Sequence, residues 1–203
     1  MNNLNTLTIR RWDNGDVIFS YTCKNNTMRK TVIEAINQNI NLSYAFLSGC
    51  DLTGINLKDV NLSNADLSYA YLDNITELNT NFTNAKGLND QCPKEGSFIG
   101  WKKCLDAFGG EYIVKLEIPA EAKRSSSTAE KCRCDKAKVL EIQCLDGTIA
   151  DIDHVFSNYN RFFIYNVGEI VFPDSFDDKF WNECGHGIHF FMNRQDAVDY
   201  DFF

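Results

Sequence analysis

A five-residue rhythm constrains the first half of this chain more than any other feature. In each repeat, two positions that are two residues apart are mostly apolar, and they form two columns along the chain. The other three positions are mainly Asn, Asp, Ser, Thr, Tyr or Lys. Leucine or phenylalanine forms the main column, at residues 42, 47, 52, 57, 62, 67, 72 and 82. Helices repeat at about 3.6 residues and strands at about 2, so neither explains this spacing. Two inward residues in five suit a chain that bends through a right angle at each repeat, with four sides closing a coil of about twenty residues. We therefore expect a square β-solenoid in which leucine stacks on leucine.

This segment resembles the pentapeptide-repeat family, whose consensus is A(D/N)LXX. The motif is present as ADLSY at 65–69 and as VNLSN at 60–64, and the resemblance covers ten repeats over residues 40–89. It implies a short right-handed quadrilateral β-solenoid of about two and a half coils. Glu77 and Gly87 interrupt the leucine column, which predicts a distorted or terminating last coil.

The residues before the repeats predict a cap made of a hairpin and a helix. In LTIRRWDNGDVIFSYTC, residues 7–23, two β-prone runs flank Asn14–Gly15, a pair that tolerates the positive φ of a tight turn. Residues 27–39 predict a helix, and Thr31 with Glu34 has the spacing of a capping box. Its apolar face comprises Met28, Val32, Ala35 and Ile36.

The second half predicts a compact α+β domain behind a turn-rich connector at 87–98. Alternating or apolar runs predict strands within 111–119, 136–144, 161–173 and 187–191, and a short helix follows at 193–200 with Asn193 as N-cap. Between the first two strands, KRSSSTAEKCRCDK is too polar for a core and predicts a long loop at 123–136. The predicted domains are therefore residues 1–39, 40–90 and 91–203, and the chain as a whole is mainly β.

The pattern from CPKEGSFIGWKKC at 92–104 to AVDY at 197–200 resembles an uncharacterised domain that is often fused to pentapeptide repeats in phage and prophage proteins. The resemblance implies a phage origin and, from the class of protein, a role against a host defence or regulatory factor. It implies no catalytic residues.

The cellular location is predicted from the lack of a membrane-spanning segment, a signal peptide and a disulfide framework in the sequence. No apolar run approaches the roughly 18 residues that a membrane span needs, and the N-terminus lacks the layout of a signal peptide. The eight cysteines form no compact disulfide framework. We expect a cytoplasmic protein with reduced thiols and no membrane partner. The exposed end of a short solenoid and the aromatic tail DYDFF predict a homodimer.

Charge points to a local anion site rather than to a nucleic-acid surface. The net charge is −8, yet residues 121–138 carry six lysines and arginines against three acids. Lysine, arginine and hydroxyl groups are the donors that phosphate oxygens require. A solvated, charge-balanced loop is the alternative. The predicted ligand-binding residues are Lys102, Lys123, Arg124, Ser125, Ser126, Thr128, Lys131, Arg133, His189 and Tyr200.

Two other kinds of site are weaker hypotheses. Cys184, His186 and His189 with Cys132 and Cys134 could ligate zinc, but the pairs lack the spacing of a zinc knuckle, so we expect no metal. The stretch GHGIHFFMNRQDAVDY at 185–200 resembles the GxGIYFA…A.Y segment of poly-ADP-ribose polymerases, without a downstream glutamate. The order DIDHVFS at 151–157 lacks a nucleophile elbow. We expect no catalytic residues and no cofactor.

Three functions follow from these features. The first is a non-enzymatic protein that captures a phosphorylated nucleotide-type small molecule, as a phage-encoded counter-defence factor. The second is an inhibitor of a host protein that acts through the solenoid by imitating DNA, because residues 40–90 carry six acids against two lysines, a net −4. The third is an ADP-ribosyltransferase-like enzyme that uses NAD.

Overall fold

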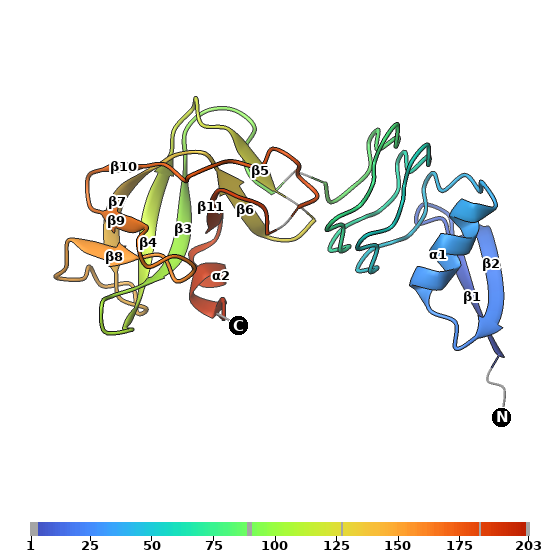
Figure 1. The fold of residues 1–203 in the computed structure, drawn as a ribbon, viewed down its shortest axis with the longest axis horizontal. Coiled ribbons are helices and arrows are strands. Elements are labelled where there is room, and N and C mark those ends of the chain that lie inside the picture. The colour runs from blue at the N-terminus through green and yellow to red at the C-terminus, as the bar shows by residue number, and fades with distance from the viewer. Residues whose placement is uncertain (1–3, 89–90, 127, 183, 202–203) are drawn as a thin grey trace. The chain divides into compact units, whose positions relative to one another are not determined.

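A computed structural model describes residues 4–88, 91–126, 128–182 and 184–201 and divides the chain into two compact units (Figure 1). The repeat unit comprises Met1–Asn89, Ser127–Ala129 and Trp181–Cys184. The sheet unit comprises Asp90–Ser126, Glu130–Phe180 and Gly185–Phe203. Each unit has its own hydrophobic core.

The predicted N-terminal hairpin is confirmed. Strand β1 (Leu4–Arg10) pairs antiparallel with β2 (Val17–Lys24), shown in blue in Figure 1. Within the Asn14–Gly15 pair it is Gly15 that adopts the positive φ, at 80°, and its N–H donates to Arg11 O at 3.1 Å. The connection is therefore wider than the tight turn that the sequence predicts.

Helix α1 (Met28–Asn37) is also confirmed, but the predicted capping box is wrong. Thr27 is the N-cap, and its side chain accepts a hydrogen bond from Lys30 N at 3.2 Å. Thr31 lies one turn further into the helix, where its buried hydroxyl donates to Thr27 O at 3.1 Å. Thr27 has the extended backbone of an N-cap, with φ −127° and ψ 161°, so the helix starts one turn before the predicted cap.

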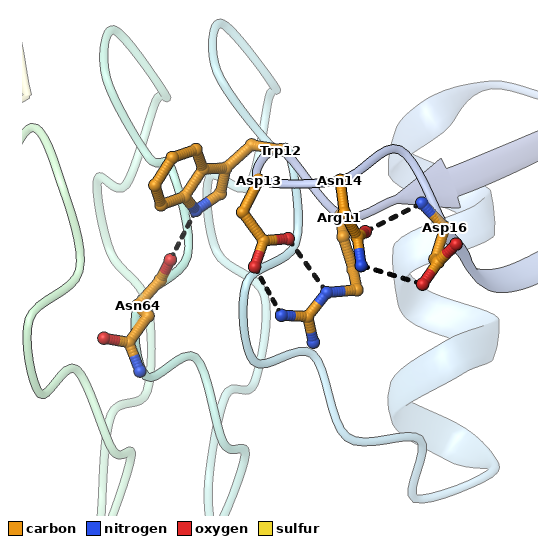
Figure 2. A network of polar contacts seen from close by, with 6 residues as sticks. All are labelled: Arg11, Trp12, Asp13, Asn14, Asp16 and Asn64. Carbon is orange, nitrogen blue, oxygen red and sulfur yellow. Dashed lines mark hydrogen bonds and ion pairs between the residues drawn. The ribbon is translucent and has the colours of Figure 1, made fainter.

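The hairpin turn docks on the repeats through Trp12 (Figure 2). The indole N–H donates to Asn64 O at 2.6 Å, and the Trp12 backbone N–H donates to Tyr44 O at 3.0 Å. The Lys86 ammonium lies 3.1 Å from the centre of the indole ring, a cation–π contact. The Arg11 guanidinium donates two hydrogen bonds to the Asp13 carboxylate, of 2.9 and 2.6 Å, which stiffens the turn. The turn thereby contacts three successive passes of the repeat segment, residues 40–88, at Tyr44, Asn64 and Lys86.

The repeat segment is built around the two predicted columns, which form its core. The main column is fully or almost fully buried from Leu42 to Leu72, with exposed fractions of 0–1%. Ile9 of β1 and Val32 of α1 belong to the same core, so the hairpin and helix share it. Parallel bridges join residues twenty positions apart, at 46–66, 51–71, 56–76, 61–81 and 66–86. One pass through the segment therefore takes twenty residues.

Every fifth residue of the segment has a left-handed backbone. Positive φ occurs at residues 39, 44, 49, 54, 59, 64, 69, 74, 79 and 84, between 56° and 67°. Most of these residues are Asn, Asp or Gly, the types that tolerate this region. Three positions earlier, Asn or Asp side chains such as Asn41 and Asp51 accept from the backbone N–H two residues on, at 2.9 and 3.0 Å. The polar positions of the repeat thus make its turns.

The main column ends at Gly87 because no side chain fits there. A Cβ built on Gly87 would lie 2.6 Å from Ser68 N, and its φ of +75° suits glycine. The chain therefore approaches the preceding pass more closely at this point than a leucine would allow.

The sheet unit is β-rich, and the prediction of a mainly β chain is confirmed. Its strands lie in the order β10-β7-β4-β3-β11-β6-β5, and β8 pairs with β3 and β9. Their bounds are β3 Phe98–Leu105, β4 Glu111–Ile118, β5 Arg124–Ser126, β6 Lys131–Cys134, β7 Ala137–Gln143, β8 His154–Phe156, β9 Ile164–Asn166, β10 Ile170–Val171 and β11 Ile188–Phe191. The predicted strands correspond to β4, β7, β9, β10 and β11. Helix α2 (Arg194–Asp199) follows β11, and its predicted N-cap is confirmed, because the Asn193 side chain accepts from Gln195 N at 3.0 Å.

The predicted long loop at 123–136 is wrong, because half of it forms β5 and β6. The two strands pair antiparallel, and β6 also pairs with β11, which buries Ser125 and Arg133 to 2% exposure each. The segment is polar, but its backbone groups are satisfied by the sheet and its longest side chains bond within the fold, so polarity does not exclude it from the interior.

No helix among the described residues is long and apolar enough to cross a membrane. The predicted bounds 1–39, 40–90 and 91–203 stay predictions.

Candidate functional site

The ten predicted ligand residues do not form one site. In the register of the sheet, Ser125 of β5 lies opposite Arg133 of β6, and Arg133 lies opposite His189 of β11. Residues directly opposite each other point to the same face, so these three form a row, which we call the polar row. Lys131 lies two residues before Arg133, on the same face.

Other predicted residues point to the opposite face of the sheet. Arg124 and Ser126 alternate with Ser125 along β5. Lys102 lies on the same face of β3 as Gly100 and Cys104, two residues away on either side, and that face packs on the main core of the sheet unit. These three residues therefore cannot contact a ligand held by the polar row.

Arg124 is a structural residue. Its guanidinium donates to Ala122 O at 3.0 Å, to Gly96 O at 2.8 Å and, more weakly, to Pro93 O at 3.4 Å. Two further bonds, both of 2.7 Å, go to Pro119 O and Ala120 O. These bonds tie the connector before β3 to the turn between β4 and β5. Because the Arg124 guanidinium is occupied by these carbonyls, it cannot also bind a phosphate.

Three more predicted ligand residues make hydrogen bonds within the fold. Lys102 Nζ donates to His189 O at 3.1 Å, and burial lowers the pKa of this ammonium. Lys123 is exposed, and its backbone N–H donates to Asp135 Oδ1 at 2.9 Å. Thr128 belongs to the repeat unit, where its hydroxyl donates to Ala70 O and its carbonyl accepts from Tyr69 N at 3.0 Å. It extends the edge of the repeat segment and is not part of the sheet unit.

The polar row is buried. Arg133 is the largest fully buried side chain described, and its Nη2 donates to Lys179 O at 2.9 Å. A Cβ added to Gly185 would collide with Arg133 Nη1 and lie 2.7 Å from Asp177 Oδ2, so guanidinium and carboxylate approach the same point. Ser125 Oγ is also buried and has no hydrogen-bonding partner among the residues that the structure describes.

Sequence reasoning missed Asp177, Lys179 and Gly185. Asp177 N donates to His186 O at 3.0 Å, and Asp177 Oδ1 accepts from Lys179 N at 3.0 Å, so this turn holds the carboxylate in place. These residues lie more than forty positions from Arg133 in the chain. The two glycines Gly185 and Gly187, which follow the acidic pair 177–178 within ten residues, are the local pattern that could have drawn attention to them.

Tyr200 and Lys131 extend the row toward α2. The Lys131 ammonium lies 5.8 Å from the centre of the Tyr200 ring, and that ring lies 5.2 Å from the ring of Phe191. Tyr200 is 37% exposed, so this end of the row is open to solvent while Ser125 and Arg133 are not.

A hollow of about 620 Å³ lies elsewhere on the sheet unit, and none of the ten residues lines it. Its polar lining is Asp106, Asp151, Asp153 and His154, and the His154 ring bonds to Asp153 at 2.6 Å. Three carboxylates make this hollow unsuited to a phosphate.

The zinc hypothesis has no support in the described part of the chain. Across residues 4–88, 91–126, 128–182 and 184–201, no group of three or more His, Cys, Asp or Glu side chains is placed to hold a metal ion.

Comparison with known proteins adds two matches. The model of a family described as "Family of unknown function (DUF5758)" matches residues 88–197. The model of pentapeptide repeats matches residues 40–76 with eight copies. This confirms that the five-residue rhythm is a pentapeptide repeat, over a shorter segment than the ten repeats predicted for residues 40–89. No curated protein and no solved structure matches the chain. The phage origin, the counter-defence role, the inhibitor and transferase alternatives, the homodimer and the cytoplasmic location stay predictions.

Proposed function

The chain belongs to the family of unknown function DUF5758, through residues 88–197, and we propose that it is a non-enzymatic binding protein that captures a phosphorylated nucleotide-type small molecule at Ser125, Arg133 and His189. The polar row carries the proposal. It is a buried arginine flanked on neighbouring strands by a hydroxyl and an imidazole, and the hydroxyl has no partner among the described residues.

The chemistry of the row suits a phosphate group. Directly opposite residues on adjacent strands have Cβ atoms about 4.5–5.5 Å apart, so one phosphate can contact the hydroxyl and the guanidinium together. Arginine offers forked donors, and a buried site strengthens each charged hydrogen bond. Asp177 offsets the charge of Arg133, and Lys131 supplies a second cation on the same face. The aromatic ring of Tyr200 at the open end offers a surface for a base.

Replacing Ser125 with alanine tests the proposal. Loss of one hydrogen bond to a charged phosphate costs about 1.5–3 kcal/mol, roughly a ten- to hundredfold loss of affinity. Stability should stay the same or rise slightly, because the variant removes a buried polar atom that bonds to no described residue. Calorimetry with cyclic dinucleotides, ADP-ribose and inorganic phosphate measures the affinity, and urea unfolding measures the stability.

Ser126→Ala is the matched control. Ser126 lies next in the chain but faces the other side of the sheet, and its Oγ accepts from Gln91 N at 3.1 Å. This variant should lose stability by about 1 kcal/mol and keep its affinity. Absence of heat with every probe, or equal affinity of Ser125→Ala and the native protein, would show that the row binds no phosphate.

The transferase alternative predicts a different outcome for the same row. A binding protein returns its ligand intact after denaturation, whereas an ADP-ribosyltransferase releases nicotinamide from NAD. Incubation with NAD followed by chromatography separates the two, and release of nicotinamide would contradict the non-enzymatic proposal.

We also propose that the repeat segment is a quadrilateral β-solenoid. Its support is the set of parallel bridges between residues twenty apart, the buried leucine column and the left-handed residue at every fifth position. Four corners in each twenty-residue pass follow from the last of these.

The corners give a testable expectation at Tyr69. Tyr69 has a φ of +59°, a conformation that costs a tyrosine about 1–2 kcal/mol and an asparagine less. Tyr69→Asn should therefore stabilise the protein by about 0.5–1 kcal/mol. Tyr71 is equally exposed, at 57%, but takes part in a parallel bridge to Asp51, where asparagine is a poor strand former. Tyr71→Asn should destabilise the protein, and the same sign for both variants in urea unfolding would contradict the corner assignment.

A further inference from the structure

The turn between β1 and β2 holds the only asparagine–glycine pair of the sequence, at Asn14 and Gly15, and the proposed function uses neither residue. Both residues are exposed. Asp16 holds the two polar atoms of the Asn14 side chain, as Figure 2 shows. Asn14 Oδ1 accepts from Asp16 N at 3.0 Å, and Asn14 Nδ2 donates to Asp16 Oδ2 at 2.8 Å. The amide group of Asn14 is therefore held close to the backbone that follows it.

The surroundings of this amide favour attack by the next backbone nitrogen. Asparagine is among the thermally labile residues. Gly15 has no side chain to hinder the reaction, and a Cβ built on it would meet no atom within 4 Å. The bond from Asp16 N points at Asn14 Oδ1, the oxygen on which negative charge develops during the attack. The bond from Gly15 N to Arg11 O, of 3.1 Å, must open first, and its place in an exposed turn permits this.

The repeat segment provides an internal comparison. Four asparagines there make the same side-chain turn, with Oδ1 accepting from the backbone N–H two residues on at 2.9–3.0 Å. In each case the next residue is a leucine or phenylalanine of the main column, and the N–H of Leu42, Leu57 and Leu62 is bonded to the following pass. The side-chain geometry is shared, so the glycine and its exposure set Asn14 apart. The four asparagines are Asn41, Asn56, Asn61 and Asn81.

We propose that Asn14 deamidates spontaneously through a cyclic imide with Gly15, and that this modification loosens the hairpin turn from the repeat segment. The Gly15 nitrogen loses its proton and attacks Asn14 Cγ, so that a C–N bond forms. The bond from Cγ to Nδ2 breaks, and the amide nitrogen leaves as ammonia with that proton. Water then opens the imide at either carbonyl and gives aspartate or isoaspartate. One water is consumed, one ammonia is released and nothing is oxidised or reduced.

The modification changes the network of Figure 2 in two ways. The new carboxylate cannot donate to Asp16, so two like charges replace a hydrogen bond of 2.8 Å, close in the chain to the carboxylate of Asp13. Isoaspartate also adds one carbon atom to the main chain two residues after Trp12. Because Trp12 docks on the repeats through bonds of 2.6 and 3.0 Å, a displaced turn weakens this contact.

The experiment incubates the full-length protein at neutral and at mildly alkaline pH and maps tryptic peptides by mass spectrometry. Trypsin releases residues 12–24, in which Asn14 is the only asparagine. We expect this peptide to gain the mass of an amide-to-carboxylate exchange and to be labelled by an isoaspartyl methyltransferase. The gain should be faster at alkaline pH, because the Gly15 nitrogen must lose its proton. The four asparagines of the repeats should stay unmodified.

Two variants separate the chemistry from its structural effect. Asn14→Gln should stay unmodified, because a glutamine side chain needs a larger ring, and it should keep the native melting temperature. Asn14→Asp carries the new charge from the start. It should lower the melting temperature by about 2–4 °C, the shift that the loss of one hydrogen bond gives in a chain of this size. It should also speed deuterium exchange at the Trp12 indole N–H, which bonds to Asn64 O in the native protein.

Three results would overturn the proposal. The first is no mass gain at Asn14 over a time in which the urea-unfolded protein is fully modified, since the turn then protects the amide. The second is an equal gain at the asparagines of the repeats. The third is a native melting temperature together with native indole exchange in Asn14→Asp, which would show that the modification leaves the docking of the turn intact.

Discussion

Replacing Leu62 with alanine should destabilise the repeat unit by about 2–5 kcal/mol. Leu62 is 0% exposed and stands in the middle of the main column, with other buried leucines of the column on both sides. The variant loses the transfer free energy of the side chain and leaves a cavity. The stacked passes cannot close it, because backbone hydrogen bonds such as that from Leu62 N to Asn81 O, 2.9 Å long, hold them in place. Urea unfolding should show a lower midpoint with an unchanged slope.

Ser63→Ala is the matched control for Leu62→Ala. Ser63 is the next residue, half-buried, and its backbone carbonyl still accepts from Tyr44 N in the variant. Its effect should stay within about 0.5 kcal/mol. Ligand binding by the folded Leu62 variant should match the native protein, since the polar row lies in the other unit. A loss below about 1 kcal/mol at Leu62 would contradict a tightly packed column.

The repeat segment was predictable because its structure is encoded locally. The two inward columns, the interruption at Gly87 and the twenty-residue pass all follow from a five-residue period. The left-handed corners were not predicted, although Asn, Asp and Gly occupy most of them. Tyr44 and Tyr69 obscure the pattern, because tyrosine has no intrinsic preference for that conformation.

The candidate site was less predictable. Which side chains lie together depends on the register of the strands and on partners far away in the sequence. Arg124 and Arg133 look alike in a polar stretch, yet they lie on opposite faces of adjacent short strands. Arg124 bonds to carbonyls up to 31 residues earlier, and Arg133 to a carbonyl 46 residues later. The sequence prediction includes Ser125, Arg133 and His189 among its ligand residues. It could not separate them from Arg124, Ser126 and Lys102, since alternation along β5 and β6 emerges only once the strands are known.

Arg124 is therefore expected to act on stability, in contrast to the phosphate contact that the sequence predicts. Arg124→Ala should lower the free energy of unfolding by about 2–4 kcal/mol. Its guanidinium makes five bonds to backbone carbonyls, of 2.7 to 3.4 Å, and lies 5.1 Å from the Phe98 ring centre. Each bond contributes about 0.5–1.5 kcal/mol, and water replaces part of the loss because the side chain is half-exposed. Urea unfolding measures the change, and phosphate affinity should stay that of the native protein while the variant is folded.

Arg124→Lys tests how much of the stability depends on the planar guanidinium and how much on its positive charge. An ammonium keeps the positive charge near Cys92 but cannot reach carbonyls on both the connector and the β4–β5 turn, so about half of the stability loss should remain. Phosphate affinity should stay that of the native protein in Arg124→Lys, because Arg124 and Arg133 lie on opposite faces of the sheet. Lys123→Ala, at the exposed neighbouring residue, should leave both measurements within error. Full stability of Arg124→Ala together with a tenfold loss of phosphate affinity would instead place Arg124 in the ligand site and contradict its structural role.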